Sequence, residues 1–143
     1  MGGARIAVIG AGRMGHGIAW RFAAAGHQVR IQDSETAALD ALSARLDEIR
    51  EALDAGEDVA GRIKATSDLR AAAEDADFVF EAAPENLPLK QALFGALEAQ
   101  APGHAILCSN TSAIPIAQIA EQVAQKHRVV GTHFWNPPYL VDL

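Results

Sequence analysis

A short apolar run that ends in a glycine-rich turn is the feature that most limits how this chain can fold. The turn is Gly10-Ala11-Gly12-Arg13-Met14-Gly15; it directly follows Ile6-Ala7-Val8-Ile9, and apolar residues then recur at helical spacing as far as Phe22. An unbroken apolar run of this length is typical of a strand covered on both faces, as in a parallel sheet. The segment therefore predicts a strand, a tight turn and a helix that ends near Gly26, the opening unit of an α/β fold.

Each glycine of the turn has a separate use if the turn holds a dinucleotide. Gly10 permits the tight turn, Gly12 leaves room for a pyrophosphate, and Gly15 lets the helix pack closely on the strand. The first amides of the helix then point at the pyrophosphate. We predict cofactor contacts along the whole turn, at Gly10, Ala11, Gly12, Arg13, Met14 and Gly15. The turn alone leaves open a nicotinamide enzyme, a flavoprotein and a non-catalytic nucleotide sensor.

A carboxylate at the end of the second predicted strand indicates which dinucleotide is bound. Asp33 follows the strand at 28–32 and lies eighteen residues after Gly15. From there it can accept hydrogen bonds from both hydroxyls of an adenosine ribose, whereas the 2′-phosphate of NADP would be repelled. We therefore predict NAD as the cofactor. The alternative is that Asp33 only caps the next helix, a role that Ser34 could also fill.

Strands and helices alternate along the rest of the chain. Further strands are predicted at 62–66, 78–80, 105–108 and 129–131, and further helices at 39–53, 68–74, 86–101 and 115–123. The segment 56–61 is predicted to be a loop. Alternation with short connections predicts one Rossmann-type α/β domain over 1–143, a doubly wound, mostly parallel six-stranded sheet with helices on both faces.

The predicted helix at 39–53 carries one apolar stripe, with charged residues over the rest of its surface. The stripe is formed by Leu39, Leu42, Leu46, Ile49 and Leu53. Steps of three and four residues are typical of a helix that packs one face on its own domain. A stripe that meets a partner or a second domain has the same pattern, so both interpretations stay open.

Charge and composition exclude several classes of protein. The 143 residues carry 12 basic and 18 acidic side chains, a formal net charge of −6, and the acids are spread along the chain. Nucleic acid is not expected as a partner, because its binding needs a positive patch. The apolar runs are too short for a signal segment or a membrane span, so we expect a cytoplasmic protein that binds no membrane.

Cysteine and histidine usage gives no sign of a metal or a disulfide. Cys108 is the single cysteine and falls on a predicted strand, so we expect it to be a small buried apolar side chain. The histidines lack the spacing of metal ligands, and no metal is expected.

Three polar segments follow the fourth, fifth and sixth predicted strands. They are 82–86 (Ala-Ala-Pro-Glu-Asn), 109–112 (Ser-Asn-Thr-Ser) and 133–138 (His-Phe-Trp-Asn-Pro-Pro). The carboxyl ends of parallel strands meet at one edge of the sheet, where open α/β folds bind ligands. We therefore expect the three segments to lie together beside the dinucleotide.

His133 is the candidate for proton transfer. Oxidation of an alcohol needs a base for the hydroxyl proton, and imidazole titrates near neutral pH. Ser112 and Asn136 could hold the substrate oxygen beside the imidazole. Each residue also has a structural alternative. The imidazole could be a hydrogen-bond partner within the fold, Ser112 could cap the helix after Pro115, and Asn136 could only set the turn that follows it.

Four motifs in a fixed order make the sequence more specific than the turn alone. They are Ile-Gly-Ala-Gly-x-Met-Gly at 9–15, Pro-Glu-Asn-Leu-x-x-Lys at 84–90, Ser-Asn-Thr-Ser at 109–112 and His-Phe-x-Asn-Pro at 133–137. Together they resemble the 3-hydroxyacyl-CoA dehydrogenase family across nearly the whole chain. The resemblance implies an NAD-dependent oxidoreductase of fatty acid metabolism that acts on the 3-hydroxyl of an acyl-CoA.

The resemblance also implies a role for particular residues. His133 would be the catalytic base, and Ser112 and Asn136 would contact the substrate and the nicotinamide. Further cofactor contacts would come from Asp33 on the ribose, the backbone of Ala82, Glu85, Lys90, Asn110 and Ser112.

The sequence also departs from the pattern of the family. Family members are longer, with a C-terminal helical domain, and they pair the histidine with a glutamate that would fall two residues past Leu143. A buried acid often orients a catalytic imidazole, so we expect the chain as given to bind NAD with little turnover. We also expect a homo-oligomer, formed through a surface that a longer chain would cover.

The class of small-molecule substrate stays open. The segment after the helix at 39–53 shows no second helix of the kind that carries CoA contacts in the family. The run 136–139, Asn-Pro-Pro-Tyr, is similar to relatives that oxidise carnitine or gulonate and to lens λ-crystallin. The alternatives to an acyl-CoA enzyme are therefore a free hydroxy-acid dehydrogenase and a non-catalytic NAD-binding module.

Overall fold

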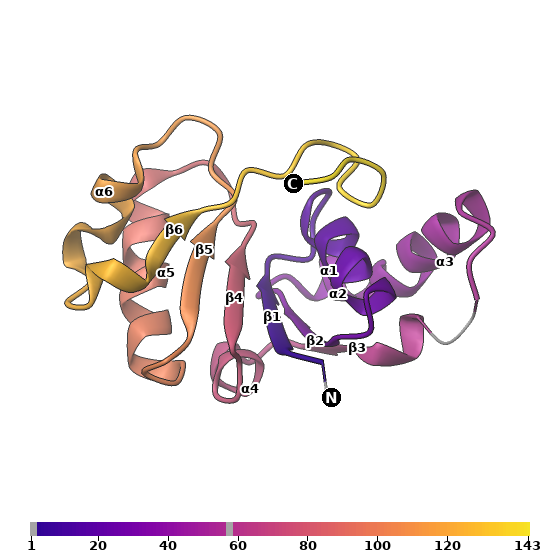
Figure 1. Cartoon of the computed structure of the whole chain (residues 1–143), viewed down its shortest axis with the longest axis horizontal. Helices are drawn as coiled ribbons and strands as arrows, with labels where there is room; N and C mark the ends of the chain where they lie inside the picture. The colour runs from indigo at the N-terminus through magenta and orange to yellow at the C-terminus, as the bar shows by residue number, and fades with distance from the viewer. Residues whose placement is uncertain (1–2, 57–58) are drawn as a thin grey trace.

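The alternating pattern folds into a parallel sheet, whose strands lie side by side in Figure 1. The computed structural model describes residues 3–56 and 59–143. In these ranges the strands are β1 (Arg5–Ile9), β2 (Gln28–Gln32), β3 (Ile63–Thr66), β4 (Phe78–Glu81), β5 (Ile106–Ser109) and β6 (Val129–Gly131). They lie in the order β3-β2-β1-β4-β5-β6, and every neighbouring pair is parallel. The winding reverses between β1 and β4, which opens a crevice at the carboxyl ends of these strands.

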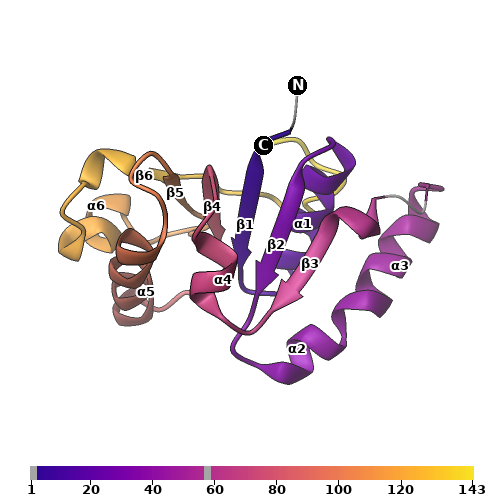
Figure 2. The same cartoon turned by 90° about the horizontal axis from the view of Figure 1, so that it is seen from below.

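Helices cover both faces of the sheet, as the two views in Figures 1 and 2 show. The α-helices are α1 (Gly15–Ala24), α2 (Thr36–Asp40), α3 (Leu42–Ala52), α4 (Leu69–Ala73), α5 (Leu87–Gln100) and α6 (Ile116–Ile119). Short 3₁₀ turns are η1 (Ala60–Arg62), η2 (Ala120–Gln122) and η3 (Lys126–Arg128). No described helix is both long enough and apolar enough to cross a membrane.

Two hydrophobic cores lie on opposite faces of the sheet. The first is shared with α1 and α3, and the second with α4, α5 and α6. Strand β1 contributes to both, because Ile6 and Val8 belong to the first core while Ala7 and Ile9 belong to the second. The unbroken apolar run at the start of the sequence is thus buried on both faces, as in other parallel sheets. The predicted Rossmann-type fold is confirmed.

The predicted helix at 39–53 is divided into α2 and α3 by a bend at Ala41. On α3 the apolar stripe is buried against α1 through Leu42, Leu46 and Ile49. This part of the stripe therefore packs on its own domain, which was one of the two interpretations of its spacing. The predicted loop at 56–61 lies partly outside the described residues.

The predicted helix at 115–123 is shorter than its apolar spacing suggested. It ends as an α-helix at Ile119 and continues as the 3₁₀ turn η2. Tightening of the last turn in this way is common, because it satisfies carbonyl groups that have no partner at the end of an α-helix.

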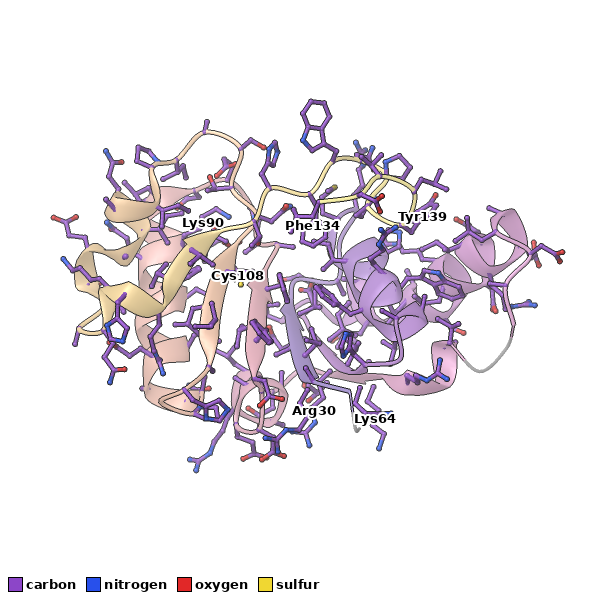
Figure 3. All side chains as sticks on the ribbon, in the orientation of Figure 1. Arg30, Lys64, Lys90, Cys108, Phe134 and Tyr139 are labelled. Atoms are coloured by element: carbon purple, nitrogen blue, oxygen red, sulfur yellow. The ribbon has the colours of Figure 1, made fainter. Side chains whose placement is uncertain are left out.

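The chain after β6, residues 132–143, crosses the carboxyl edge of the sheet and lies over α1 (Figure 1); we call it the tail. Phe134 points inward from the tail (Figure 3) and packs on Phe80, with ring centroids 6.0 Å apart. Farther along, a Cβ on Gly17 would lie only 2.5 Å from Cγ of Pro138. Glycine at this position of α1 therefore allows the close approach of the tail, a contact that the sequence reasoning missed.

Cys108 is buried on β5, as predicted for an apolar side chain, and is 2% exposed (Figure 3). Burial raises the pKa of its thiol to about 12, although a hydrogen bond with Thr132 acts in the opposite direction. The thiol therefore stays protonated and unreactive near neutral pH.

Candidate active site

The glycine-rich turn between β1 and α1 has the tight backbone packing that its sequence predicts. Gly10 has a backbone φ of +103°, which residues with a side chain rarely adopt. A Cβ on Gly10 would also lie 2.8 Å from the carbonyl oxygen of Ala82. A Cβ on Gly15 would lie 1.7 Å from the carbonyl oxygen of Gly10. Both glycines are therefore required by the backbone of the protein itself.

Gly12 differs from the other two, because a Cβ there would meet no protein atom within 4 Å. It lines a cavity of about 680 Å³ at the carboxyl ends of β1, β2 and β4. Open space at this position is what a diphosphate needs in order to approach the backbone. Of the predicted cofactor residues, this cavity is lined by Gly10, Gly12, Arg13, Met14, Asp33 and Ala82. The cavity therefore fits a dinucleotide.

Asp33 lies at the end of β2 and is tied to the glycine-rich turn. Its Oδ2 accepts a hydrogen bond from the amide of Ala11 at 2.8 Å, and its Oδ1 accepts one from the amide of Glu35 at 2.9 Å. Helix α2 has Glu35 as its N-cap residue and no side-chain cap. The alternative that Asp33 only caps this helix is therefore wrong, and its carboxylate lines the cavity instead.

A second cavity, of about 270 Å³, adjoins the first at the start of α1. It is lined by Met14, Asn110, Ser112, His133, Phe134, Trp135 and Asn136. Met14 lines both cavities. Segments that follow β5 and β6 are thus brought beside the glycine-rich turn, as expected from the parallel topology.

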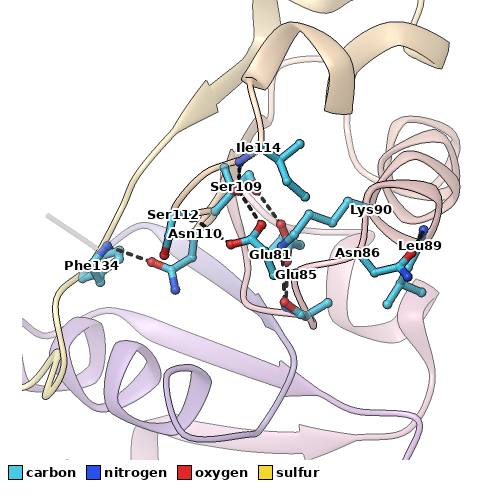
Figure 4. A network of polar contacts seen from close by, with 12 residues as sticks. Glu81, Glu85, Asn86, Leu89, Lys90, Ser109, Asn110, Ser112, Ile114 and Phe134 are labelled. Carbon is cyan, nitrogen blue, oxygen red and sulfur yellow. Dashed lines mark hydrogen bonds and ion pairs between the residues drawn. The ribbon is translucent and has the colours of Figure 1, made fainter.

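The hydroxyl of Ser112 lies 3.0 Å from Nε2 of His133. Ser112 does not cap the helix that follows it, because α6 has no side-chain cap and the nearby amide of Ile114 donates to Thr111 Oγ1 at 3.0 Å. The backbone next to the imidazole is also held, since the amide of Phe134 donates to Oδ1 of Asn110 at 2.7 Å (Figure 4). The hydroxyl and the imidazole are thus paired inside the second cavity.

Glu85 joins the segment after β4 to the segment after β5. Its carboxylate accepts hydrogen bonds from the hydroxyl of Thr111 at 2.5 Å and from the amide of Ser112 at 2.9 Å. Burial by itself would raise the pKa of Glu85, but these hydrogen bonds and the charges of Lys90 and His133 lower it below its usual value of 4.5. A carboxylate that stays ionised thus lies within electrostatic reach of the imidazole.

A buried network supports the segment after β4 (Figure 4). Nζ of Lys90 donates to Oε1 of Glu81 at 2.6 Å and to the carbonyl oxygen of Ala83 at 3.2 Å. The hydroxyl of Ser109 donates to the other carboxylate oxygen of Glu81 at 2.6 Å. Glu81 and Lys90 are 0% and 1% exposed, so their charges compensate each other inside the protein.

The sequence of the chain matches a known family. Residues 5–143 match the sequence profile of the NAD binding domain of 3-hydroxyacyl-CoA dehydrogenase. The chain belongs to this family. It is 41% identical over 146 residues to the 3-hydroxyadipyl-CoA dehydrogenase of Escherichia coli K12, with 96% of this chain and 30% of that protein covered. It is 36% identical over 146 residues to the L-carnitine dehydrogenase of Streptomyces griseus, with 97% of this chain and 43% of that protein covered.

A solved relative in the 3-hydroxyacyl-CoA dehydrogenase family has the same fold. The crystal structure of 3-hydroxybutyryl-CoA dehydrogenase from Escherichia coli K12 superposes with a TM-score of 0.88 at 36% identity, covering 98% of this chain and 31% of that one. The chain therefore spans between 30% and 43% of the length of these three relatives. The chain contains the NAD-binding domain of the family, and its cofactor is NAD.

In this 3-hydroxyacyl-CoA dehydrogenase domain, two predicted contact residues also have structural partners. Lys90 is directed at Glu81 inside the protein, and Glu85 is directed at the segment after β5. Their contacts with the cofactor remain predictions. Sequence reasoning missed Glu81 itself, although a glutamate that ends an apolar strand was a signal that a buried cation lies nearby.

Proposed function

We propose that the protein is an NAD-dependent oxidoreductase that transfers hydride between NAD and the 3-hydroxyl of an acyl-CoA, with His133 as general base. One observation carries the proposal: the hydroxyl of Ser112 lies 3.0 Å from Nε2 of His133 in the cavity that adjoins the dinucleotide cavity at Met14. An alcohol oxidation needs a base within hydrogen-bond reach of the substrate hydroxyl, and Ser112, which could hold the substrate oxygen, lies within that reach of the imidazole.

The residues of the chain divide the work between two cavities. The glycine-rich turn holds the diphosphate and Asp33 holds the adenosine ribose. When bound, NAD supplies the hydride acceptor. His133 takes the hydroxyl proton of the substrate, and returns it in the reverse direction. Ser112 and Asn136 orient the substrate oxygen beside the imidazole.

The carboxylate of Glu85 holds the segment that carries Ser112 in place beside His133. Glu85 and His133 influence each other electrostatically, and the hydrogen bond from the Ser112 amide fixes the carboxylate beside the reacting pair. Ala82 and Asn110 line the two cavities on the cofactor side, while Lys90 supports the segment after β4 through Glu81 and Ala83.

The exposed apolar residues of the tail support association of the protein with copies of itself. Trp135, Leu140 and Leu143 are 66%, 59% and 68% exposed. Large exposed apolar side chains favour burial against another chain. We include a homo-oligomer in the proposal for this reason.

The test replaces His133 by glutamine in the full-length protein and follows NADH absorbance with acetoacetyl-CoA as substrate. We expect kcat to fall by roughly 10²–10⁴-fold, because the base is lost. The affinity for NADH should not change, since the turn and Asp33 are untouched. A variant that keeps the parent rate would refute the role of His133. NADH binding without any reaction, in the parent too, would instead favour a non-catalytic NAD-binding module.

A second candidate is a free hydroxy-acid dehydrogenase of the carnitine type, and Trp135 favours it. The indole is 66% exposed, lines the second cavity, and has its centroid 6.3 Å from that of the His133 ring. Aromatic faces are the groups that bind quaternary ammonium ligands, and carnitine carries one. The L-carnitine dehydrogenase of Streptomyces griseus is among the relatives.

A panel of 3-hydroxybutyryl-CoA, L-carnitine and gulonate separates the two candidates. The acyl-CoA proposal expects the highest kcat/KM with the thioester. The second candidate would replace the first if kcat/KM were higher with L-carnitine than with the thioester. In that case Trp135→Ala should lower kcat/KM with L-carnitine and leave kcat/KM with the thioester unchanged.

A further inference from the structure

The side chain of Arg45 reaches the glycine-rich turn from α3. Its Nη1 donates a hydrogen bond to the carbonyl oxygen of Ala11 at 2.8 Å. Leu42 and Leu46, on the same face of α3, are buried against α1. Arg45 is itself partly buried, so its apolar stem lies along this contact and its guanidinium meets the turn.

The peptide groups on both sides of Ala11 are held by the protein. The amide of Ala11 donates to Asp33 at 2.8 Å, while its carbonyl oxygen accepts from Arg45 at the same distance. The amide of Gly10 donates to the carbonyl oxygen of Gln32 at 2.7 Å. The side chain of Ala11 is fully buried. The conformation that leads into Gly12 is therefore fixed by hydrogen bonds within the protein.

His16 makes a further contact on the same side of the turn. Its Nδ1 lies 2.6 Å from the carbonyl oxygen of Gly12. Burial lowers the pKa of His16 below its usual value of 6.5, and the charge of Arg45 acts in the same direction, against the hydrogen bond with Gly12 and the charge of Glu48. The imidazole of His16 is uncharged near neutral pH, so the positive charge beside this part of the turn belongs to Arg45.

We propose that Arg45 is a positioning residue for NAD binding. It does not line the cavity that fits the dinucleotide. It holds the carbonyl group of Ala11 and so keeps the turn in the conformation in which Gly12 faces the diphosphate. A charge-assisted hydrogen bond is among the stronger contacts that a backbone carbonyl can make. A turn ordered before the ligand arrives spares the binding step the entropy of ordering it.

The test compares Arg45→Met with Arg50→Met, a matched control on the same helix. Arg50 also carries one positive charge, but among the described residues its guanidinium forms ion pairs with the surface carboxylates of Asp47 and Glu51. NADH and ADP-ribose are titrated into each variant by calorimetry. We expect Arg45→Met to weaken both ligands by about tenfold and Arg50→Met to change neither by more than about twofold. Arg45→Lys should recover part of the affinity, because an ammonium can still donate to Ala11.

Two further measurements separate positioning from the other effects of a cation. Long-range attraction is screened by salt, so the loss in Arg45→Met should persist at high ionic strength if the contact with the turn causes it. Amide hydrogen exchange at residues 11–14, measured without any ligand, should be faster in Arg45→Met than in the parent or in Arg50→Met. Thermal melts verify that each variant is folded. If Arg45→Met is unfolded, Arg45→Lys replaces it in the salt and the hydrogen-exchange measurements.

Three outcomes would overturn the proposal. One is an NADH affinity in Arg45→Met within about twofold of the parent. Another is exchange of the turn amides that is no faster than in the parent. The third is a loss of affinity that disappears at high salt, because long-range attraction alone would then explain it. The exchange experiment uses no ligand, so it tests Arg45 whatever the substrate of the enzyme is.

Discussion

The two halves of the carboxyl edge build their parts of the site in different ways. Beside β1 and β2, the predicted contact groups belong mainly to the backbone of the turn 10–15, where Gly12 leaves open space. Beside β4, β5 and β6 they are side chains, where His133 pairs with Ser112 and Glu85 holds the segment that carries Ser112. The first half centres on one local stretch of chain, which Asp33 and Arg45 hold in place. The second half exists only where three separate segments meet.

The difference teaches how each half can be disrupted. A site made of backbone is blocked when a side chain is added, because the added atoms occupy the space of the ligand. A site made of side chains is damaged when one partner is removed, because the group left behind loses its hydrogen bond or its counter-charge. Each half should therefore respond to a different kind of substitution.

The largest effect is expected in the second half, from Lys90→Met. This change leaves the carboxylate of Glu81 buried without a counter-charge. Removal of one partner of a buried ion pair typically costs about 3–5 kcal/mol, so we expect that loss in the free energy of unfolding. Urea denaturation followed by circular dichroism measures it. Lys126→Met, at an exposed lysine, is the control and should change stability little.

A second substitution checks the reason for this loss. Glu81→Gln added to Lys90→Met should recover part of the stability, because the buried charge is gone and the amide can still accept from Ser109. A loss in Lys90→Met no greater than in the Lys126→Met control would contradict the picture of a side-chain network that holds this half of the edge.

An intermediate effect is expected in the first half, from Gly12→Ala. The added methyl group meets no protein atom within 4 Å, so the free energy of unfolding should stay within about 0.5 kcal/mol of the parent. The affinity for NAD should fall by roughly tenfold or more, because overpacking a close contact costs about 1–3 kcal/mol. Calorimetry and denaturation on the same sample measure the two quantities.

Gly15→Ala is the matched comparison for Gly12→Ala. Its Cβ would lie 1.7 Å from the carbonyl oxygen of Gly10, so the fold itself should lose about 1–3 kcal/mol. The two glycines are then distinguished by which measurement changes. Equal losses of stability in both variants would break the distinction between a glycine needed by the fold and a glycine needed by the ligand.

The smallest effect is expected from the ionisation of Glu85. The pKa of Glu85 is lower in the folded protein than its usual value of 4.5. Its carboxylate therefore contributes its full stabilisation of the fold at pH values above 4.5. The stabilisation is lost as the pH falls through the folded pKa. Solvent screens this exposed group, so the contribution should be no more than about 1 kcal/mol. Thermal melts of the parent and Glu85→Gln, from about pH 7 down to about pH 3, should converge in acid. A constant difference between them would mean that ionisation of Glu85 plays no part.

The sequence predicted the elements better than it predicted the contacts between them. The strand at 6–9, the turn at 10–15 and the helix that begins near Asn86 were all identified, and Oδ1 of Asn86 accepts from the amide of Leu89 at 2.9 Å. These features depend on neighbours within a few residues in the chain. The division of the helix at Ala41 was not predicted, because apolar spacing alone runs through it without interruption.

The site residues follow the same rule. The strand-end position of Ser112 and His133 was predicted, but which atoms they face was not. Glu85 was expected toward the cofactor, and its bonds to Thr111 and Ser112 were not foreseen. Arg45 carried no motif at all, since its partner is a backbone carbonyl 34 residues away in the chain.

The sequence by itself determined the order of strands and helices and the position of the glycine-rich turn, because both follow from short-range sterics and apolar periodicity. Only the tertiary structure decided which polar side chains pair. Glu81 lies opposite Ser109 because β4 and β5 adopt one particular register, and a shift of one residue would turn these side chains to opposite faces of the sheet. Register is a property of two strands together, and neither strand contains it alone.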